Sequence, residues 1–256
     1  MPDSALQSRS EVLSDAELRQ KRVDLAAVFR WVARLNMHEG VGNHFSAAVS
    51  ADGSKFLMNP RCVHFKRVTA SNLVLLDAND KSTMDRPDAP DATAWFIHGR
   101  LHAKLPQAGC IMHLHPRYAT ALAALADSTI LPIDQTTMRF YGRVAHDEAF
   151  GGMALSEDEG DRLAALLGDK EVMMMGNHGV LTAASSVALA FDLMYYYERA
   201  AETQMLAYAT GKKLRIASDN VAKLTASQWA EYPGLAEDHL REVKAILDVE
   251  EPDYRD

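Results

Sequence analysis

The sequence is poor in cysteine and contains no long apolar run. Its two cysteines among 256 residues, Cys62 and Cys110, form no Cys-x-x-Cys pair, so neither a zinc ribbon nor a disulfide framework is indicated. No apolar stretch reaches the roughly 18 residues that a membrane span needs. The polar N-terminus also lacks the apolar centre of a signal peptide. These absences favour a cytoplasmic protein without a membrane-spanning helix.

Runs of lysine and arginine are missing as well. The net charge is −8, and no basic stripe is present that would match the phosphate backbone of a nucleic acid. We therefore expect this protein to act on a small molecule, with neither a nucleic acid nor a membrane as its partner.

The residues that are present predict one large α/β domain. Strand-like and helix-like segments interleave with antiparallel hairpins, such as the turn at Ala51-Asp52-Gly53-Ser54, which predicts helices layered on a mixed sheet. We expect a flexible N-terminal arm over residues 1–22 and the main domain over residues 23–215. A helical extension of the same domain, with one helix over residues 235–247, is expected over residues 216–256.

A His-x-His pair is the most informative motif. The segment Met112-His113-Leu114-His115-Pro116 follows an apolar run, which indicates a strand that the proline ends. Side chains alternate between the two faces of a strand, so His113 and His115 point the same way. Two adjacent imidazoles are half of a tetrahedral metal site. Without a third ligand, two structural histidines beside a turn explain the pattern equally well.

A third histidine follows another buried strand. His178 lies in the turn Gly176-Asn177-His178-Gly179, directly after the apolar segment Val172–Met175. The two glycines allow a tight bend and a close approach of the backbone to a ligand. Three neutral imidazoles leave at least one coordination position open, as in catalytic metal sites. The triad His113, His115 and His178 suits Zn²⁺ or Mn²⁺, and Co²⁺ and Fe²⁺ also accept such ligands.

Several segments together resemble a known family. They are Glu39–Ser46, Ile111–His115 and Gly176–Leu181, with further similarity at Phe56–Pro60, Val68–Ser71 and Arg139–Gly142. In order and separation they resemble the markers of the class II aldolase and adducin family, and the adducin-like branch in particular. The resemblance implies a three-layer α/β/α fold around a central mixed, largely antiparallel sheet. It also implies a divalent metal on the three histidines and a homotetramer with active sites between subunits.

One departure from the family bears on the chemistry. The family's aldolases and epimerases place a glutamate before the His-x-His strand, where it ligates metal or serves as acid and base. Alignment on Trp95-Phe96-Ile97-His98 puts Ala94 at that position, and an alanine can neither coordinate nor transfer a proton. The preceding Ala92 and Thr93 stand where the family has paired serines. These changes argue against ordinary retro-aldol cleavage of a sugar phosphate.

The expected substrate pocket also departs from the family's sugar-phosphate pattern. Gly42 and Asn43 keep the family pattern, whereas a Thr-Gly dipeptide of the family corresponds to Arg61-Cys62. Together with His44, the guanidinium of Arg61 suits a carboxylate, which it can hold through two parallel hydrogen bonds. The expected substrate-binding residues are therefore Gly42, Asn43, His44, Arg61 and Thr93.

These observations favour a metal-dependent lyase that decarboxylates a small hydroxylated aromatic, heteroaromatic or oxo carboxylate. A metal bound by an oxygen next to the carboxylate can delocalise the charge that forms as CO₂ leaves, without a strong base beside the metal. A proton must still return to carbon. His98, one helical turn after Ala94, and Tyr141 are the expected donors.

Two other functions stay open. The first is an aldolase or epimerase acting on a sugar or sugar phosphate, whose acid has moved to Glu39, Asp134 or Glu148. The second is a non-catalytic, adducin-like binding or scaffold domain. A free-standing domain that keeps all three histidines favours catalysis over the scaffold, and metal analysis of the purified protein distinguishes the two.

Overall fold

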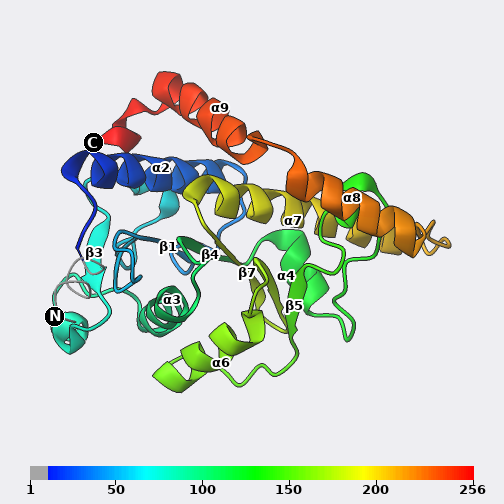
Figure 1. Cartoon of the computed structure of the whole chain (residues 1–256), viewed down its shortest axis with the longest axis horizontal. Coiled ribbons are helices and arrows are strands. Elements are labelled where there is room, and N and C mark those ends of the chain that lie inside the picture. Colours follow the sequence, from blue (N-terminus) through cyan, green and yellow to red (C-terminus); the bar gives the residue numbers. More distant parts are fainter. Residues whose placement is uncertain (1–10) are drawn as a thin grey trace, which may run out of the picture.

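The computed structural model describes residues 11–256, and its centre is a seven-stranded sheet (Figure 1). The strand order across the sheet is β3-β2-β1-β4-β7-β6-β5. Every neighbouring pair is antiparallel except β5 and β6, which are parallel, so the predicted mixed and largely antiparallel sheet is confirmed. The strands are β1 (His44–Ala48), β2 (Lys55–Met58), β3 (Val74–Asp77), β4 (Cys110–Leu114), β5 (Val144–Asp147), β6 (Val172–Met175) and β7 (Gly179–Ala184).

Helices cover both faces of this sheet, as the predicted three-layer fold requires. Figure 1 shows α2 and α7 on one side of the sheet and α3 and α6 on the other. No helix of the described residues combines the length and apolarity needed to cross a membrane. The α-helices are α2 (Asp15–Arg34), α3 (Ala92–Lys104), α4 (Arg117–Ala123), α5 (Gln135–Met138), α6 (Glu157–Leu167), α7 (Val187–Ala209), α8 (Asp219–Glu231) and α9 (Leu235–Glu250).

The prediction of a flexible arm over residues 1–22 is wrong for its second half. Residues 1–10 lie outside the described part, but α2 begins at Asp15. The start of this helix is fixed by a capping box, in which Ser14 and Glu17 satisfy each other's backbone N–H groups. Just before it, the backbone N–H of Leu13 donates to the carbonyl of Val49 at 2.9 Å, which ties the chain to the sheet.

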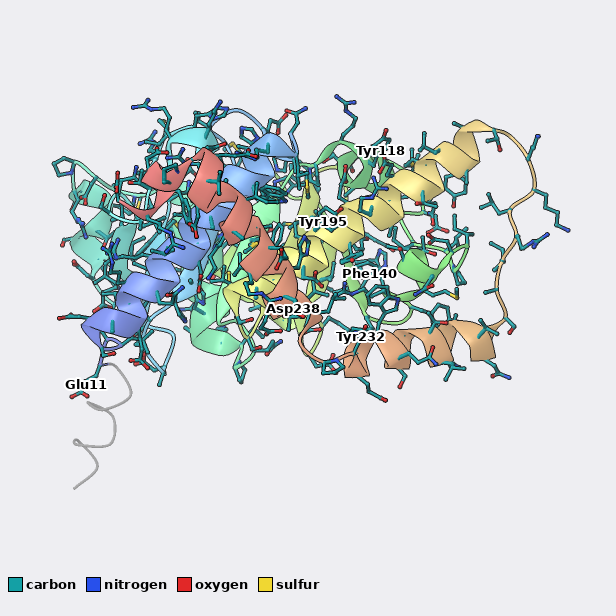
Figure 2. The ribbon with its side chains drawn as sticks, turned by 90° about the horizontal axis from the view of Figure 1, so that it is seen from above. Glu11, Tyr118, Phe140, Tyr195, Tyr232 and Asp238 are labelled. Carbon is teal, nitrogen blue, oxygen red and sulfur yellow. The ribbon has the colours of Figure 1, made fainter. Side chains whose placement is uncertain are left out.

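The C-terminal extension contains two helices where the sequence predicted one. The expected helix is α9, and α8 precedes it. Seen from above in Figure 2, α9 lies across α2 and α7. Asp253, which follows α9, accepts a hydrogen bond at 2.7 Å from the buried guanidinium of Arg30 on α2. The same guanidinium donates to the carbonyl of Val68 at 2.8 Å. This end of the chain therefore completes the helical layer over the sheet.

Candidate metal centre

The three predicted ligands converge at the ends of adjacent strands. His113 lies in β4, His115 follows the end of that strand, and His178 lies in the turn between β6 and β7. Because β7 pairs with both β4 and β6, the sheet brings the two histidine-bearing segments together. The Nε2 atom of His113 lies 3.0 Å from Nε2 of His115 and 3.2 Å from Nε2 of His178. Ligands at 2.0–2.1 Å in a tetrahedral zinc site stand about 3.3 Å apart, so this spacing fits a metal ion.

Hydrogen bonds on the far side of two rings fix where their lone pairs point. Nδ1 of His113 donates to the carbonyl of Val180 at 3.1 Å, and Nδ1 of His115 donates to the carboxylate of Glu39 at 2.5 Å. A neutral imidazole with a proton on Nδ1 carries its lone pair on Nε2. Burial lowers the pKa of His113 well below its usual value and that of His178 to about 4. Neutral lone pairs that face one another repel, and a cation between them removes that repulsion.

The turn that carries His178 packs tightly against Leu114 and the ring of His115. A Cβ at Gly179 would lie 2.5 Å from the carbonyl oxygen of Leu114 and 2.7 Å from Cδ2 of His115. The backbone N–H of Asn177 also donates to the carbonyl of Ala123 at 2.9 Å, which fixes the turn to the end of α4. Glycine at position 179 is therefore required by close approach, with the backbone in an ordinary conformation.

Glu39 holds the ring of the candidate ligand His115 from its far side, a role that the sequence does not predict. It was considered only as a relocated acid, because nothing in a linear sequence pairs it with a histidine 76 positions away. Its own backbone N–H donates to Oδ1 of Asn43 at 2.7 Å, so the turn before β1 holds it in place. A carboxylate on the far nitrogen of a metal-binding histidine fixes the ring and raises its basicity as a ligand.

The Glu39→Gln variant should bind metal more weakly while its fold is unchanged. Loss of such an outer partner costs about 10–100-fold in metal affinity, and we expect the lower end of that range because the Glu39 side chain is 69% exposed. Competition with a chromophoric chelator measures the change. Glu242→Gln, a surface substitution on α9, is the control. Equal affinities in both variants would remove Glu39 from the site.

A cavity of about 180 Å³ adjoins the centre through His44. The ring centroids of His44 and His113 are 5.0 Å apart. Buried Asn43 has an Nδ2 atom without a hydrogen-bond partner among the described residues, and Arg61 is exposed without an ion pair there. Arg61 is thus a hydrogen-bond donor at the cavity without an assigned acceptor. Its lining includes Gly42, Asn43, His44, Arg61, Asp91 and Ala94.

Three other predicted residues lie elsewhere. Thr93 does not line the cavity, and its hydroxyl donates to Asp91 at 2.6 Å. His98 is completely buried with both ring nitrogens bonded, so the expectation that it donates a proton directly to substrate is wrong. The hydroxyl of Tyr141 donates to Asp219 on α8, and this chain does not bring Tyr141 to the histidines.

Two of the residues expected as a relocated acid, Asp134 and Glu148, do not line the cavity. Asp134 caps α5 by accepting from the N–H of Thr137 at 2.7 Å, and Glu148 follows β5 without lining the cavity. Asp91, which the sequence analysis missed, does line it, three positions before Ala94. Burial raises the pKa of Asp91, but the hydrogen bonds from the hydroxyl and N–H of Thr93 lower it by more. The pKa of Asp91 is therefore below its usual value. Asp91 is thus an ionised carboxylate in the cavity that Ala94 also lines.

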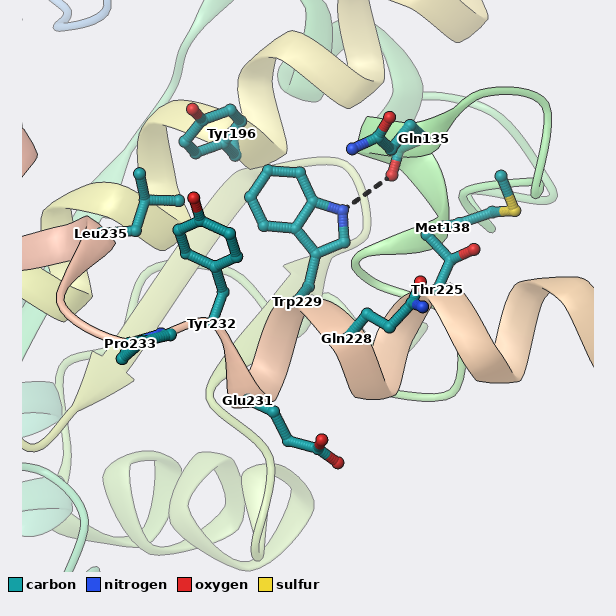
Figure 3. Close-up of a pocket in the computed structure, with 10 residues that line it drawn as sticks. All are labelled: Gln135, Met138, Tyr196, Thr225, Gln228, Trp229, Glu231, Tyr232, Pro233 and Leu235. Carbon is teal, nitrogen blue, oxygen red and sulfur yellow. Dashed lines mark hydrogen bonds between the residues drawn. The ribbon is translucent and has the colours of Figure 1, made fainter.

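A larger cavity lies away from this chemistry. It measures about 860 Å³ and lies between α5, α7 and α8, with Tyr196, Trp229 and Tyr232 among its lining side chains (Figure 3). The indole N–H of Trp229 donates to the carbonyl of Gln135 at 3.0 Å, which joins α8 to α5. None of the three histidines lines this cavity, so its size does not make it the candidate metal centre.

Comparisons with known proteins agree with this geometry. A family model described as Class II Aldolase and Adducin N-terminal domain matches residues 23–205. A Pseudomonas aeruginosa protein whose name places it in aldolase class 2 is 34% identical over 195 residues, 76% of this chain and 74% of that protein. The decarboxylase NovR of Streptomyces niveus is 26% identical over 204 residues, 79% of this chain and 75% of that protein. The crystal structure of an aldolase II superfamily protein from Pseudomonas syringae is 32% identical, with a TM-score of 0.85 over 98% of this chain and 100% of that one.

Proposed function

Because this chain belongs to the class II aldolase and adducin family, we propose that it is a divalent-metal-dependent carbon–carbon lyase that decarboxylates a small carboxylate. The observation that carries the proposal is an intact histidine triad beside a cavity where alanine stands at the position of the usual acid. His113, His115 and His178 would hold the ion, with Zn²⁺ or Mn²⁺ as the expected metal. The similarity to a protein named as a decarboxylase supports the reaction class.

The cavity residues would bind the carboxylate of the substrate. Arg61 can donate two parallel hydrogen bonds to it. Asn43 is proposed to hold the turn that lines the cavity, because its Oδ1 accepts from the N–H of Glu39 at 2.7 Å. Gly42 at the turn leaves room for the substrate to approach the backbone. Thr93 is proposed to act through Asp91, whose carboxylate it orients.

The reaction then breaks the bond between the carboxylate carbon and its neighbour. CO₂ leaves, the electron pair of that bond stays on the neighbouring carbon, and a proton from solvent water replaces the carboxyl group. A divalent ion, when bound, supplies Lewis-acid stabilisation of the substrate oxygen next to that carbon. The chain's own contribution is to hold the carboxylate at Arg61 and the oxygen toward the triad, which fixes the bond that breaks.

The decisive experiment compares two assays on the metal-loaded protein. We expect CO₂ release from members of a panel of dihydroxybenzoates and pyridine carboxylates, and no dihydroxyacetone phosphate or pyruvate from a panel of aldol substrates. The reverse pattern would establish an aldolase. Failure of both assays, combined with a purified protein that neither contains metal nor binds added Zn²⁺ or Mn²⁺, would support the scaffold function.

The Arg61→Ala variant should raise KM for the carboxylate substrate by about tenfold or more, since a hydrogen bond to a charged group contributes roughly 1.5–3 kcal/mol. Arg67→Ala is the matched control, because Arg67 is also exposed and outside the cavity. Steady-state kinetics of both variants measure the difference. An unchanged KM in Arg61→Ala would place this side chain at the surface only.

One observation favours the aldolase or epimerase as the second candidate. Asp91 lines the cavity beside Ala94 and is ionised, so it can accept a proton where the family's glutamate would. Under this function, Asp91→Asn should abolish aldol turnover. Under decarboxylation, the same variant should retain CO₂ release, because no strong base is required.

We also propose that the protein works as a homotetramer with active sites at the subunit interfaces. Phe150, Met153 and Leu155 are 48%, 74% and 58% exposed in the segment after β5. The ring of Phe150 lies 5.7 Å from that of His178, so this apolar surface adjoins the triad. A second copy of the chain would cover it and enclose the site. Light scattering coupled to gel filtration tests this assembly, and a monomer would contradict it.

A further inference from the structure

A buried chain of hydrogen bonds runs from Ala108, between α3 and β4, through side chains of α3 and β1 to the cavity. Nδ1 of His102 lies 2.6 Å from the carbonyl oxygen of Ala108, and its Nε2 lies 2.7 Å from Oγ of Ser46. The same Oγ contacts Nδ1 of His98 at 2.5 Å, and Nε2 of His98 contacts Nδ1 of His44 at 2.7 Å. All four side chains are buried, with exposed fractions of 4% or less.

Only one set of proton positions satisfies every contact when the rings are neutral. A carbonyl oxygen only accepts, so His102 carries its proton on Nδ1 and accepts at Nε2 from the hydroxyl of Ser46. That hydroxyl has no second proton, so it accepts from Nδ1 of His98. His98 then accepts at Nε2 from Nδ1 of His44. The carbonyl of Ala108 thus determines the tautomer of His44 through three intervening side chains.

The tautomer argument applies to neutral rings, and the burial of these rings favours that state. His98 and His102 are 0% and 4% exposed, and their ring nitrogens contact only a carbonyl, a hydroxyl and another imidazole. No carboxylate among these contacts offsets the cost of burying a charged imidazolium. His44 is 4% exposed and makes no ion pair among the described residues.

The chain ends at His44, a residue that lines the cavity. Nε2 of His44 has no hydrogen-bond partner among the described residues, and it is not one of their fully buried polar atoms without a partner. His44 lines the cavity with Asn43, Arg61 and Asp91. The free nitrogen therefore carries a lone pair at the wall where the carboxylate substrate is proposed to bind.

We propose that Ser46, His98 and His102 are positioning residues that fix His44 as a hydrogen-bond acceptor, and that the site thereby selects carboxylates bearing a hydroxyl group. A hydroxyl can donate to Nε2 of His44, whereas a keto or ether oxygen at the same place would set two lone pairs against each other. The inference rests on the proposed function for the carboxylate. It narrows the substrate class to hydroxy carboxylates and excludes oxo carboxylates.

Nitrogen NMR of histidine-labelled protein tests the chain without any turnover. In the wild-type protein near pH 7, we expect His44, His98 and His102 each to show a protonated Nδ1 and an unprotonated Nε2. Assignment of the signals by single substitution of each histidine identifies them. A protonated Nε2 on His44 would overturn the proposal, whether or not the protein proves to be a decarboxylase.

The Ser46→Ala variant tests the connection. It should leave His102 protonated on Nδ1, because the carbonyl of Ala108 remains, and should give His44 a mixture of the two tautomers. Ser46→Thr, which keeps the hydroxyl, should restore the wild-type spectrum. Zinc stoichiometry should be equal in the three proteins. An unchanged His44 signal in a folded Ser46→Ala protein would contradict the role of the chain.

Ligand binding gives the second readout. Zinc-loaded protein should bind 2-hydroxybenzoate more tightly than 2-methoxybenzoate. Ser46→Ala should reduce that ratio by about twofold or more, because only a fraction of the protein then holds His44 as an acceptor, while the other tautomer can donate to the ether oxygen. Comparing the ratio between variants cancels any difference in how the two oxygens meet the metal. An equal ratio in the two proteins would overturn the selection, even if CO₂ release is observed.

Discussion

The His115→Ala variant is expected to lose stoichiometric metal and all turnover while it keeps its fold. Loss of an outer partner already lowers metal affinity by about 10–100-fold, so loss of a ligand should exceed about 100-fold. His115 follows the end of β4 and its side chain is 22% exposed, so its removal leaves no large cavity. We expect the free energy of unfolding of the metal-free protein to change by less than about 1 kcal/mol.

Metal analysis after dialysis and thermal unfolding of the metal-free proteins measure the two effects. His146→Ala is a suitable control, since His146 is also partly buried and lies on β5 outside the triad. It should retain one metal per chain. Retention of stoichiometric metal by His115→Ala would refute the assignment of this ligand.

The Gly179→Ala variant should lose both stability and metal affinity, although position 179 contributes no ligand. The added Cβ would lie 2.5 Å from the carbonyl oxygen of Leu114, so β4 and β7 must move apart. Overpacking of this kind costs about 1–3 kcal/mol, which lowers Tm by roughly 2–12 °C for a chain of this size. The same Cβ would lie 2.7 Å from Cδ2 of His115, so the ring must rotate away from the other ligands. We expect metal affinity to fall by at least about tenfold.

Gly99→Ala provides the matched control, because a Cβ at that position in α3 would lie 3.8 Å from Cβ of Ala78, an ordinary van der Waals contact. Its Tm should be no lower than that of the wild-type protein, and its metal affinity should be equal. Calorimetry and chelator competition on both variants separate the two consequences for Gly179. Wild-type metal affinity in a destabilised Gly179→Ala protein would show that the His115 ring is held by other contacts.

The helices and strands were predictable where burial follows a simple period, and less so elsewhere. The strand Val172–Met175 is uniformly apolar and appears as predicted. The sequence missed α8 because its buried positions, Ala222 and Ala226, are small, while Val221 and Leu224 are 48% and 59% exposed. Such a helix has no broad apolar stripe, and its place in the fold comes from contacts such as that of Trp229 with α5.

The candidate site likewise contains residues that the sequence predicts and residues that it does not. His113 and His115 were predictable as neighbours because alternation along a strand is local, and the family resemblance that joined them to His178 is confirmed by the match over residues 23–205. Glu39, Asp91 and the relation of Ser46 to His98 and His102 were not predictable. They depend on which surfaces a turn, a helix start and a strand present to one another after folding.

The sequence by itself determined the candidate ligand set, the family and the absence of the usual glutamate at Ala94, because each depends on residue identity within a short segment. Only the tertiary structure decided how the triad is oriented and which carboxylate faces the cavity. It also decided the tautomer of His44, 64 positions from the carbonyl of Ala108 that sets it through the chain of contacts. Hydrogen-bond direction depends on distances between atoms of separate elements, and packing of α3 against the sheet fixes those distances.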